Sequence, residues 1–171
     1  MVKNKRILVI TGDGKGKTTS AIGIIIRSLG YEKKVAMVKF FKVQTSGEDE
    51  ILKKLSVKVY NFGQKQFFNP KKIPQALKKK IEAGWKMAQK LGNQVGGLDL
   101  LILDEINLAL AGNLIPKTDV KNFIDESLAH LVFTGRLAPR WLKNLADTVS
   151  EIKEIKHIHE KGIDAQKGIE Y

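Results

Sequence analysis

Apolar residues along the chain fall into short continuous runs, which alternate with longer stretches of helical periodicity. Six short runs predict β-strands, at residues 6–11, 34–40, 57–60, 98–103, 129–134 and 147–152. The run Leu98–Leu103 is almost continuously apolar, which is typical of a strand covered on both faces. No repeat, low-complexity segment or linker interrupts this pattern, so we expect one domain over residues 1–171.

The stretches between these runs predict helices. Thr18–Leu29 is apolar almost all round and is followed by Gly30, which predicts a buried helix that ends at this glycine. Apolar residues recur at helical spacing over 73–91 and 120–128, and Pro139 is expected to open a further helix. Strands that alternate with helices predict an α/β fold, with a mostly parallel sheet of about six strands and helices on both faces.

Composition narrows the class of protein. The chain has 171 residues, 43% of them hydrophobic, and no apolar stretch long enough to span a membrane. The apolar run at 7–10 is too short for a signal peptide, so we expect a cytoplasmic protein. Cysteine is absent, which excludes disulfides, thiolate metal sites and a cysteine nucleophile.

The formal net charge of +12 indicates an anionic partner. The lysines are spread in pairs and one triplet, without an arginine-rich or aromatic-interleaved tract of the kind that binds nucleic acid. We therefore interpret most of them as a solvated surface, and expect a small anion such as a nucleotide rather than nucleic acid or a membrane.

A glycine-rich loop follows the first predicted strand and precedes the first predicted helix. It consists of Gly12, Asp13, Gly14, Lys15, Gly16, Lys17, Thr18 and Thr19. Alternating glycines let backbone N–H groups curl inward around phosphates, and the following helix adds its dipole. Lys17 is then expected to contact the phosphates and Thr18 to bind Mg²⁺. Thr11 stands where the strict G-x-x-x-x-G-K-[ST] pattern has glycine, so the sequence predicts a variant loop on a P-loop NTPase-like fold.

A second candidate site follows another strand. Asp104 and Glu105 come directly after the apolar run Leu100–Leu103. In nucleotide-binding proteins of this class such acids hold Mg²⁺, and the alternative is an acidic pair that caps the next helix. Together with the phosphate loop, the pair favours a metal site.

Six blocks of the sequence resemble the P-loop type of ATP:corrinoid adenosyltransferase, and the loop variant with Thr11 is found in that family. The blocks are TGDGKGKTTSAIG (Thr11–Gly23), LLILDEINLAL (Leu100–Leu110), TGRLAP (Thr134–Pro139), ADTVSEI (Ala146–Ile152), KHIHEKGI (Lys156–Ile163) and AQKGIEY (Ala165–Tyr171). The resemblance covers the chain from about Lys5 to Tyr171.

The resemblance implies transfer of the 5′-deoxyadenosyl group of ATP to the Co(I) of a reduced corrinoid such as cobalamin, with release of triphosphate. Because Co(I) is the nucleophile, the protein needs none of its own. The implied partners are ATP, the corrinoid, Mg²⁺ or Mn²⁺, an electron-donating reductase and a second copy of the chain in a homodimer. Some members cover the site with a longer N-terminal extension, so we expect closure here to be looser or to use other segments.

The resemblance also assigns residues. Lys17 and Glu105 are expected to be catalytic, and Thr18, Asp104 and Glu105 to bind the metal. Phe67 and Phe68 are expected to pack under the corrin ring, with a plain core role as the alternative. Arg136 is a candidate contact to phosphate or corrinoid, or a partner of a nearby acid.

Two other functions remain open from the residues alone. A small P-loop kinase or ATPase would release ADP instead of triphosphate. A nucleic-acid-binding regulator switched by ATP is supported only by the net charge, and would bind DNA with a steep salt dependence.

Overall fold

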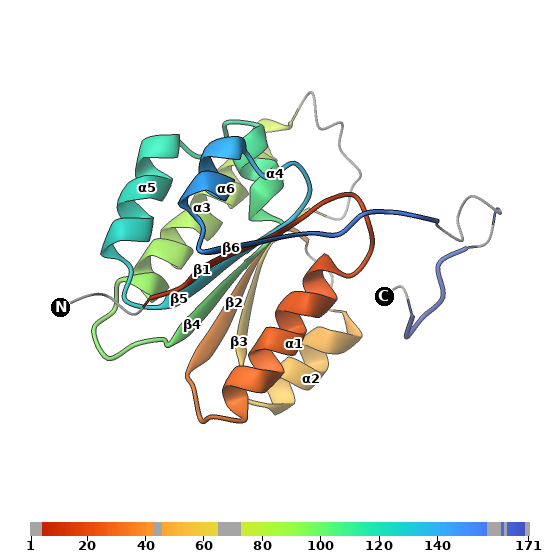
Figure 1. Ribbon diagram of the computed structural model, residues 1–171, viewed down its shortest axis with the longest axis horizontal. Coiled ribbons are helices and arrows are strands. Elements are labelled where there is room, and N and C mark those ends of the chain that lie inside the picture. Colours follow the sequence, from red (N-terminus) through yellow and green to blue (C-terminus); the bar gives the residue numbers. More distant parts are fainter. Residues whose placement is uncertain (1–4, 43–45, 65–72, 157–161, 163, 170–171) are drawn as a thin grey trace.

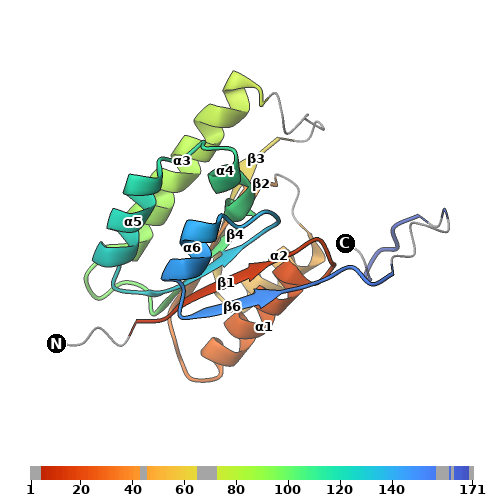
Figure 2. The same cartoon turned by 45° about the horizontal axis from the view of Figure 1, so that its top comes forward.

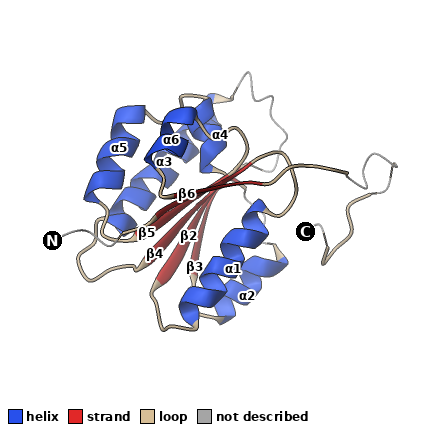
Figure 3. Ribbon diagram, viewed as in Figure 1, coloured by secondary structure: helices blue, strands red, loops and turns tan. Residues whose placement is uncertain are grey.

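A six-stranded sheet lies between two layers of helices in the computed structural model, which describes residues 5–42, 46–64, 73–156, 162 and 164–169 (Figures 1 and 3). The strands are β1 (Ile7–Thr11), β2 (Val35–Phe41), β3 (Lys58–Gly63), β4 (Leu100–Asp104), β5 (His130–Thr134) and β6 (Thr148–Glu151). The helices are α1 (Lys17–Leu29), α2 (Gly47–Lys54), α3 (Gln75–Gly92), α4 (Ile106–Ala111), α5 (Lys117–Glu126) and α6 (Arg140–Leu145).

The strands run in the order β3-β2-β4-β5-β1-β6, and every neighbouring pair is parallel. This confirms the predicted α/β class, and the architecture is consistent with a P-loop NTPase-like fold. In the register, Lys39 of β2 stands beside Asp104 of β4, and Ile10 of β1 beside Thr134 of β5. The carboxyl ends of these strands therefore meet at one edge, where open parallel sheets bind their ligands.

Helices cover both faces of the sheet, as predicted. Figures 1 and 2 show α1 and α2 on one face and α3, α4, α5 and α6 on the other. Ala21 and Ile25 of α1 belong to the buried cluster of the first face. On the second face Trp85 and Phe123 make an edge-to-face contact with ring centroids 5.1 Å apart. Trp85 is only 6% exposed and belongs to the core on this face.

Helix α1 differs from its prediction. Its residues are apolar on most sides, yet only one face is buried, because the sheet covers one side of it and α2 covers little of the rest. Ile26 is 47% exposed and lines a cavity at the carboxyl edge of the sheet. The prediction of a helix buried on all sides was therefore wrong. Apolar residues of α1 that the core does not cover line this cavity instead. Helix α2 was not predicted, and a helix at α4 entered only through the alternative that the acidic pair caps the next helix.

Strand β6 lies at the edge of the sheet, beside β1 (Figure 2), and all four of its residues are exposed. It nevertheless brings the segment after it alongside the glycine-rich loop, as described below. Helix α6 begins directly after Pro139, as predicted. Among the described residues, none of the helices combines the length and apolar character needed to cross a membrane.

Candidate active site

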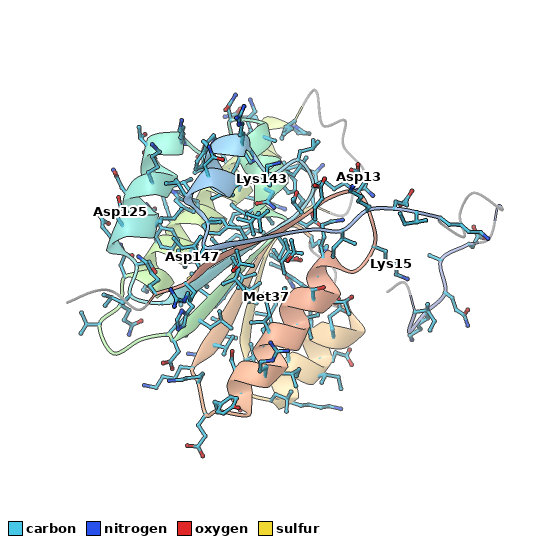
Figure 4. The ribbon with its side chains drawn as sticks, in the orientation of Figure 1. Asp13, Lys15, Met37, Asp125, Lys143 and Asp147 are labelled. Atoms are coloured by element: carbon cyan, nitrogen blue, oxygen red, sulfur yellow. The ribbon has the colours of Figure 1, made fainter. Side chains whose placement is uncertain are left out.

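The predicted phosphate loop and the predicted acidic pair lie together at the carboxyl edge of the sheet. The loop connects β1 to α1, and Figure 4 shows Asp13 and Lys15 in this loop. Asp104 ends β4, and the segments after β2 and β5 lie on its two sides, since β4 pairs with both strands. Four consecutive strands of the sheet therefore contribute to one site.

The glycine-rich loop is held against the segment that follows β6. Gly14 N–H donates to the Ile152 carbonyl at 2.9 Å, and Ile152 N–H donates to the Thr11 carbonyl at 2.8 Å. A β-carbon on Gly14 would lie 2.7 Å from the Lys153 carbonyl oxygen. Glycine is needed at this position for the close approach of the two backbones.

Thr11, the departure from the strict phosphate-loop pattern, has a structural role. It is the last residue of β1 and is only 4% exposed. Its hydroxyl accepts a hydrogen bond from Ala138 N–H at 3.2 Å, which connects β1 to the segment between β5 and α6. The loop turns one residue later, at Gly12, where φ is +101°.

Lys17, the predicted phosphate-binding lysine, is buried and folds back over its own loop. Its ammonium donates to the Gly14 carbonyl at 2.6 Å. Burial lowers the pKa of Lys17 below its usual value, and the nearby Glu105 carboxylate partly opposes this shift. A cation held in a desolvated place beside a cradle of backbone N–H groups is suited to bind phosphate.

Asp104 is the centre of the polar network at this edge. It is fully buried, and its Oδ1 accepts hydrogen bonds from the hydroxyls of Thr18 (2.9 Å) and Thr134 (2.6 Å). Its Oδ2 forms an ion pair with Lys42 at 3.2 Å. Burial disfavours the charged form of Lys42, but Asp104 and Glu105 outweigh it and raise the pKa of the lysine.

Glu105 stands between β4 and α4, at the position that precedes the helix. Its φ of 61° lies in the left-handed region, which residues with a β-carbon seldom adopt. Its N–H donates to the Thr134 hydroxyl at 3.1 Å. Burial and the adjacent Asp104 raise the pKa of Glu105, although Lys42 and Lys17 work against that shift. A bound cation would oppose both effects, because it favours the charged form of the carboxyl group.

A cavity of about 600 Å³ extends from the loop between α1 and α2. Its polar end is formed by the loop, Lys42 and Glu105, and its apolar side by Ile22 and Ile26 of α1 with Ile51 and Leu52 of α2. The full lining consists of Lys15, Gly16, Lys17, Thr18, Thr19, Ile22, Ile26, Lys42, Gly47, Glu48, Ile51, Leu52, Glu105, Gly168 and Ile169.

Helix α2 is fixed to the sheet by a buried ion pair. Lys39 of β2 is 1% exposed and forms an ion pair and hydrogen bond with Asp49. Asp49 also caps α2 by accepting from Ser46 N–H at 3.2 Å. The same lysine lies 3.8 Å from Glu48, which lines the cavity. The wall of the cavity is therefore held to the sheet through Lys39.

The remaining predicted residues have different outcomes. Arg136 donates to the Asp13 carbonyl at 3.4 Å and so lies against the loop, and its role toward phosphate, corrinoid or an acid stays a prediction. Lys15 donates to the Ile169 carbonyl at 2.8 Å, which brings residues near the end of the chain to the loop. Phe67 and Phe68 lie outside the described residues.

The side chains at this edge fit a small hard cation that is shared with a ligand. Thr18, Asp104 and Glu105 offer oxygen atoms, which Mg²⁺ prefers. The described ranges contain no cluster of three His, Cys, Asp or Glu side chains suited to hold a metal by themselves. A cation here would need further ligands, and phosphate oxygens bound in the loop are of the right kind.

Sequence reasoning assigned no role to three residues that hold this edge of the sheet together: Lys39, Lys42 and Thr134. Lys39 stands inside the apolar run of a predicted strand, which sets it apart, but its role was left open; nothing in the sequence distinguishes Lys42 from the many surface lysines. Thr134 was recognised only as the end of a strand. For Thr134 a signal existed: a polar residue that ends an apolar strand of a parallel sheet lies at the ligand-binding edge.

Comparisons with known proteins agree on one family. The family model described as ATP:corrinoid adenosyltransferase BtuR/CobO/CobP matches residues 3–171. The corrinoid adenosyltransferase of Pseudomonas aeruginosa is 36% identical, and the match covers 96% of this chain and 83% of that protein. Those of Escherichia coli K12 and Salmonella typhimurium are 34% and 33% identical, over 96% of this chain and 85% of each protein.

Proposed function

The chain belongs to the ATP:corrinoid adenosyltransferase family, and from this premise we propose how its own residues transfer the adenosyl group. In the proposed reaction, the Co(I) of a reduced corrinoid attacks C5′ of ATP. The Co–C bond forms while the C5′–O bond breaks, and the bonding electron pair leaves with inorganic triphosphate. The observation that carries the proposal is the convergence of the glycine-rich loop, Lys17, Thr18, Asp104 and Glu105 on one cavity edge.

The loop residues 12–19 are proposed to hold the triphosphate. The support is the inward turn at Gly12, the buried ammonium of Lys17 and the start of α1 at the same place. Negative charge that develops on the leaving triphosphate would be stabilised by Lys17 and by backbone N–H groups that are already oriented. The apolar side of the cavity, with Ile22 and Ile51, is proposed to take the nucleoside.

Thr18, Asp104 and Glu105 are proposed to hold Mg²⁺ or Mn²⁺ together with the phosphates. When bound, the ion would neutralise charge on the triphosphate leaving group. The role of Asp104 in this arrangement follows from its two hydroxyl contacts, which fix the orientation of its carboxylate. Glu105, whose pKa is raised by burial, would give up any proton it carries when a cation arrives.

Most of the remaining rate enhancement would come from alignment of C5′ with the cobalt. Phe67 and Phe68 are proposed to pack under the corrin ring. An electron-donating reductase, a homodimer and a cytoplasmic location are also part of the proposal, and they rest on the sequence alone.

The test uses the whole chain under anaerobic conditions with ATP, Mg²⁺ and chemically reduced cob(I)alamin. The expected result is the visible spectrum of adenosylcobalamin, together with one triphosphate released for each corrinoid converted. Lys17→Ala should abolish both signals, whereas Lys33→Ala, which alters an exposed lysine at 53% side-chain exposure, should leave them unchanged. ADP and phosphate with an unchanged corrinoid would overturn the proposal in favour of a kinase or ATPase.

A further inference from the structure

The ammonium of Lys42 lies between two oxygen atoms of the proposed metal site. Its Nζ is 3.2 Å from Thr18 Oγ1 and 3.2 Å from Asp104 Oδ2. These oxygens come from different elements, α1 and β4, and Lys42 itself follows β2. The lysine therefore connects three parts of the site through one charged group.

This position has an electrostatic reason. Asp104 is fully buried, and a buried carboxylate is costly without a positive partner. Thr18 and Thr134 donate hydrogen bonds to it but carry no charge. Lys42 supplies the compensating charge, from a side chain that is itself 40% exposed and lines the cavity. The ammonium therefore borders the cavity and can move into it without passing through the core.

We propose that Lys42 is a tethered counter-cation: it balances Asp104 until the metal–nucleotide complex binds, and then moves to the triphosphate. The inference rests on the proposed metal role of Thr18 and Asp104. A divalent cation and an ammonium cannot both lie between the same two oxygens, since their charges repel at such short range. Bound phosphates give the displaced ammonium a new anionic partner within the same cavity.

Two consequences follow from this exchange. Without nucleotide, a metal ion must displace Lys42 with no compensating partner, so metal alone binds weakly. With the triphosphate present, displacement of Lys42 adds a favourable contact. Lys42 thereby makes the binding of metal and of nucleotide mutually dependent, which is a reciprocal coupling between two ligands.

The exchange is tested by measuring how tightly the full chain binds Mn²⁺ without nucleotide. Electron paramagnetic resonance detects the Mn²⁺ that stays free. Lys42→Met should bind Mn²⁺ roughly tenfold more tightly than the wild type, because the competing charge is gone. Lys42→Arg keeps the charge and should resemble the wild type. Lys33→Met is the matched control: it removes a lysine 3.3 Å from the carboxylate of Asp99, but in an exposed pair, and should change nothing.

A second measurement follows ATP binding by calorimetry at saturating Mn²⁺. Lys42→Met should weaken it by roughly tenfold, because one phosphate contact is lost. Thermal unfolding of Lys42→Met without metal should show a folded protein with a lower midpoint than the wild type, and a larger rise on addition of Mn²⁺.

Equal Mn²⁺ affinity for Lys42→Met and wild type, without nucleotide, would overturn the role of Lys42. In that case ATP binding to Asp104→Asn, measured with and without Mn²⁺, tests the metal site separately. If Mn²⁺ no longer affects ATP binding to this variant, the proposed function stands. If Asp104→Asn instead bound Mn²⁺ and ATP as the wild type does, the metal site and the role of Lys42 would fail together.

Discussion

Gly12 lies so close to Ile152 that a β-carbon on the glycine would stand 2.2 Å from the carbonyl oxygen of the isoleucine. The clash would be with backbone, which cannot rotate away as a flexible side chain can. Gly12 also has a φ of +101°, which strains any residue with a β-carbon. The tight contact between the loop and the segment after β6 therefore depends on glycine for two independent reasons.

Gly12→Ala is expected to lower the free energy of unfolding by at least about 2 kcal/mol and to abolish ATP binding, because the loop must move away from Ile152. Gly23→Ala provides the contrast. Gly23 lies in α1, and a β-carbon there would meet nothing within 4 Å. This variant should gain about 0.5–1 kcal/mol from helix propensity and keep its ATP affinity. Urea unfolding and calorimetry measure both effects, and wild-type ATP affinity in Gly12→Ala would contradict the first.

Thr134 connects the two acids of the site, since its hydroxyl donates to Asp104 and accepts from Glu105 N–H. Thr134→Val keeps the shape but removes both hydrogen bonds. We expect a loss of about 1–3 kcal/mol in the free energy of unfolding, because buried polar groups lose a partner. The Mg²⁺ concentration needed for half-maximal activity should rise roughly tenfold, because the carboxylates lose their fixed orientation.

Thr134→Ser tests whether the hydroxyl or the shape matters. It keeps the group that donates and accepts, so its Mg²⁺ requirement should stay near that of the wild type. A serine variant as impaired as the valine variant would show that packing of the methyl group, and not the hydrogen bonds, explains the effect.

The buried pair of Lys39 and Asp49 should be strongly sensitive to the loss of one member. Lys39→Met leaves the Asp49 carboxylate, 4% exposed, without its cation. A loss of about 3–5 kcal/mol in the free energy of unfolding is expected. Adding Asp49→Asn removes the orphaned charge and keeps an oxygen for the cap of α2, so the double variant should be more stable than the single one. Denaturant unfolding of both variants measures this difference. A double variant less stable than Lys39→Met would contradict the idea that an unpaired Asp49 charge causes the loss.

Asp99 should make the stability of the protein depend on acid. The N–H of Lys34, followed by the ammonium of Lys33, holds the pKa of Asp99 below its usual value. A lowered folded-state pKa means that the carboxylate stabilises the protein above the unfolded-state pKa of about 4, and that this contribution is lost as pH falls below it. The difference in unfolding free energy between wild type and Asp99→Asn should therefore be largest at neutral pH and shrink toward pH 3. A difference independent of pH would argue against an electrostatic origin.

The sheet was predictable because its central strands are continuous apolar runs, whereas the missed helices lack that signal. In α2, GEDEILKK, only Ile51 and Leu52 are apolar; both line the cavity, and of the two only Leu52 is also a buried core residue. The acidic residue three positions after Ser46 was a readable helix start. Helix α4 has six residues, and its apolar sequence is indistinguishable from a continuation of the strand before it.

In the site, the residues that belong to local motifs were predictable, and those that act across strands were not. Lys17 and Thr18 follow from the glycine pattern, and Asp104 from the end of an apolar strand. The role of Thr134 depends on the pairing of β4 with β5, which a single sequence does not specify. Lys42 and Asp104 are far apart in sequence and meet only because β2 and β4 are neighbours.

The hydrogen bond between Gly14 and Ile152 has a consequence for the growing chain on the ribosome. The phosphate loop is synthesised early, but the segment that supports it is synthesised much later, after β5 and α6. A nascent chain without β6 has no partner for Gly14 N–H, and the early loop stays incomplete until that strand emerges. With the proposed phosphate role of this loop, nucleotide binding is therefore expected only after the strand has joined the sheet.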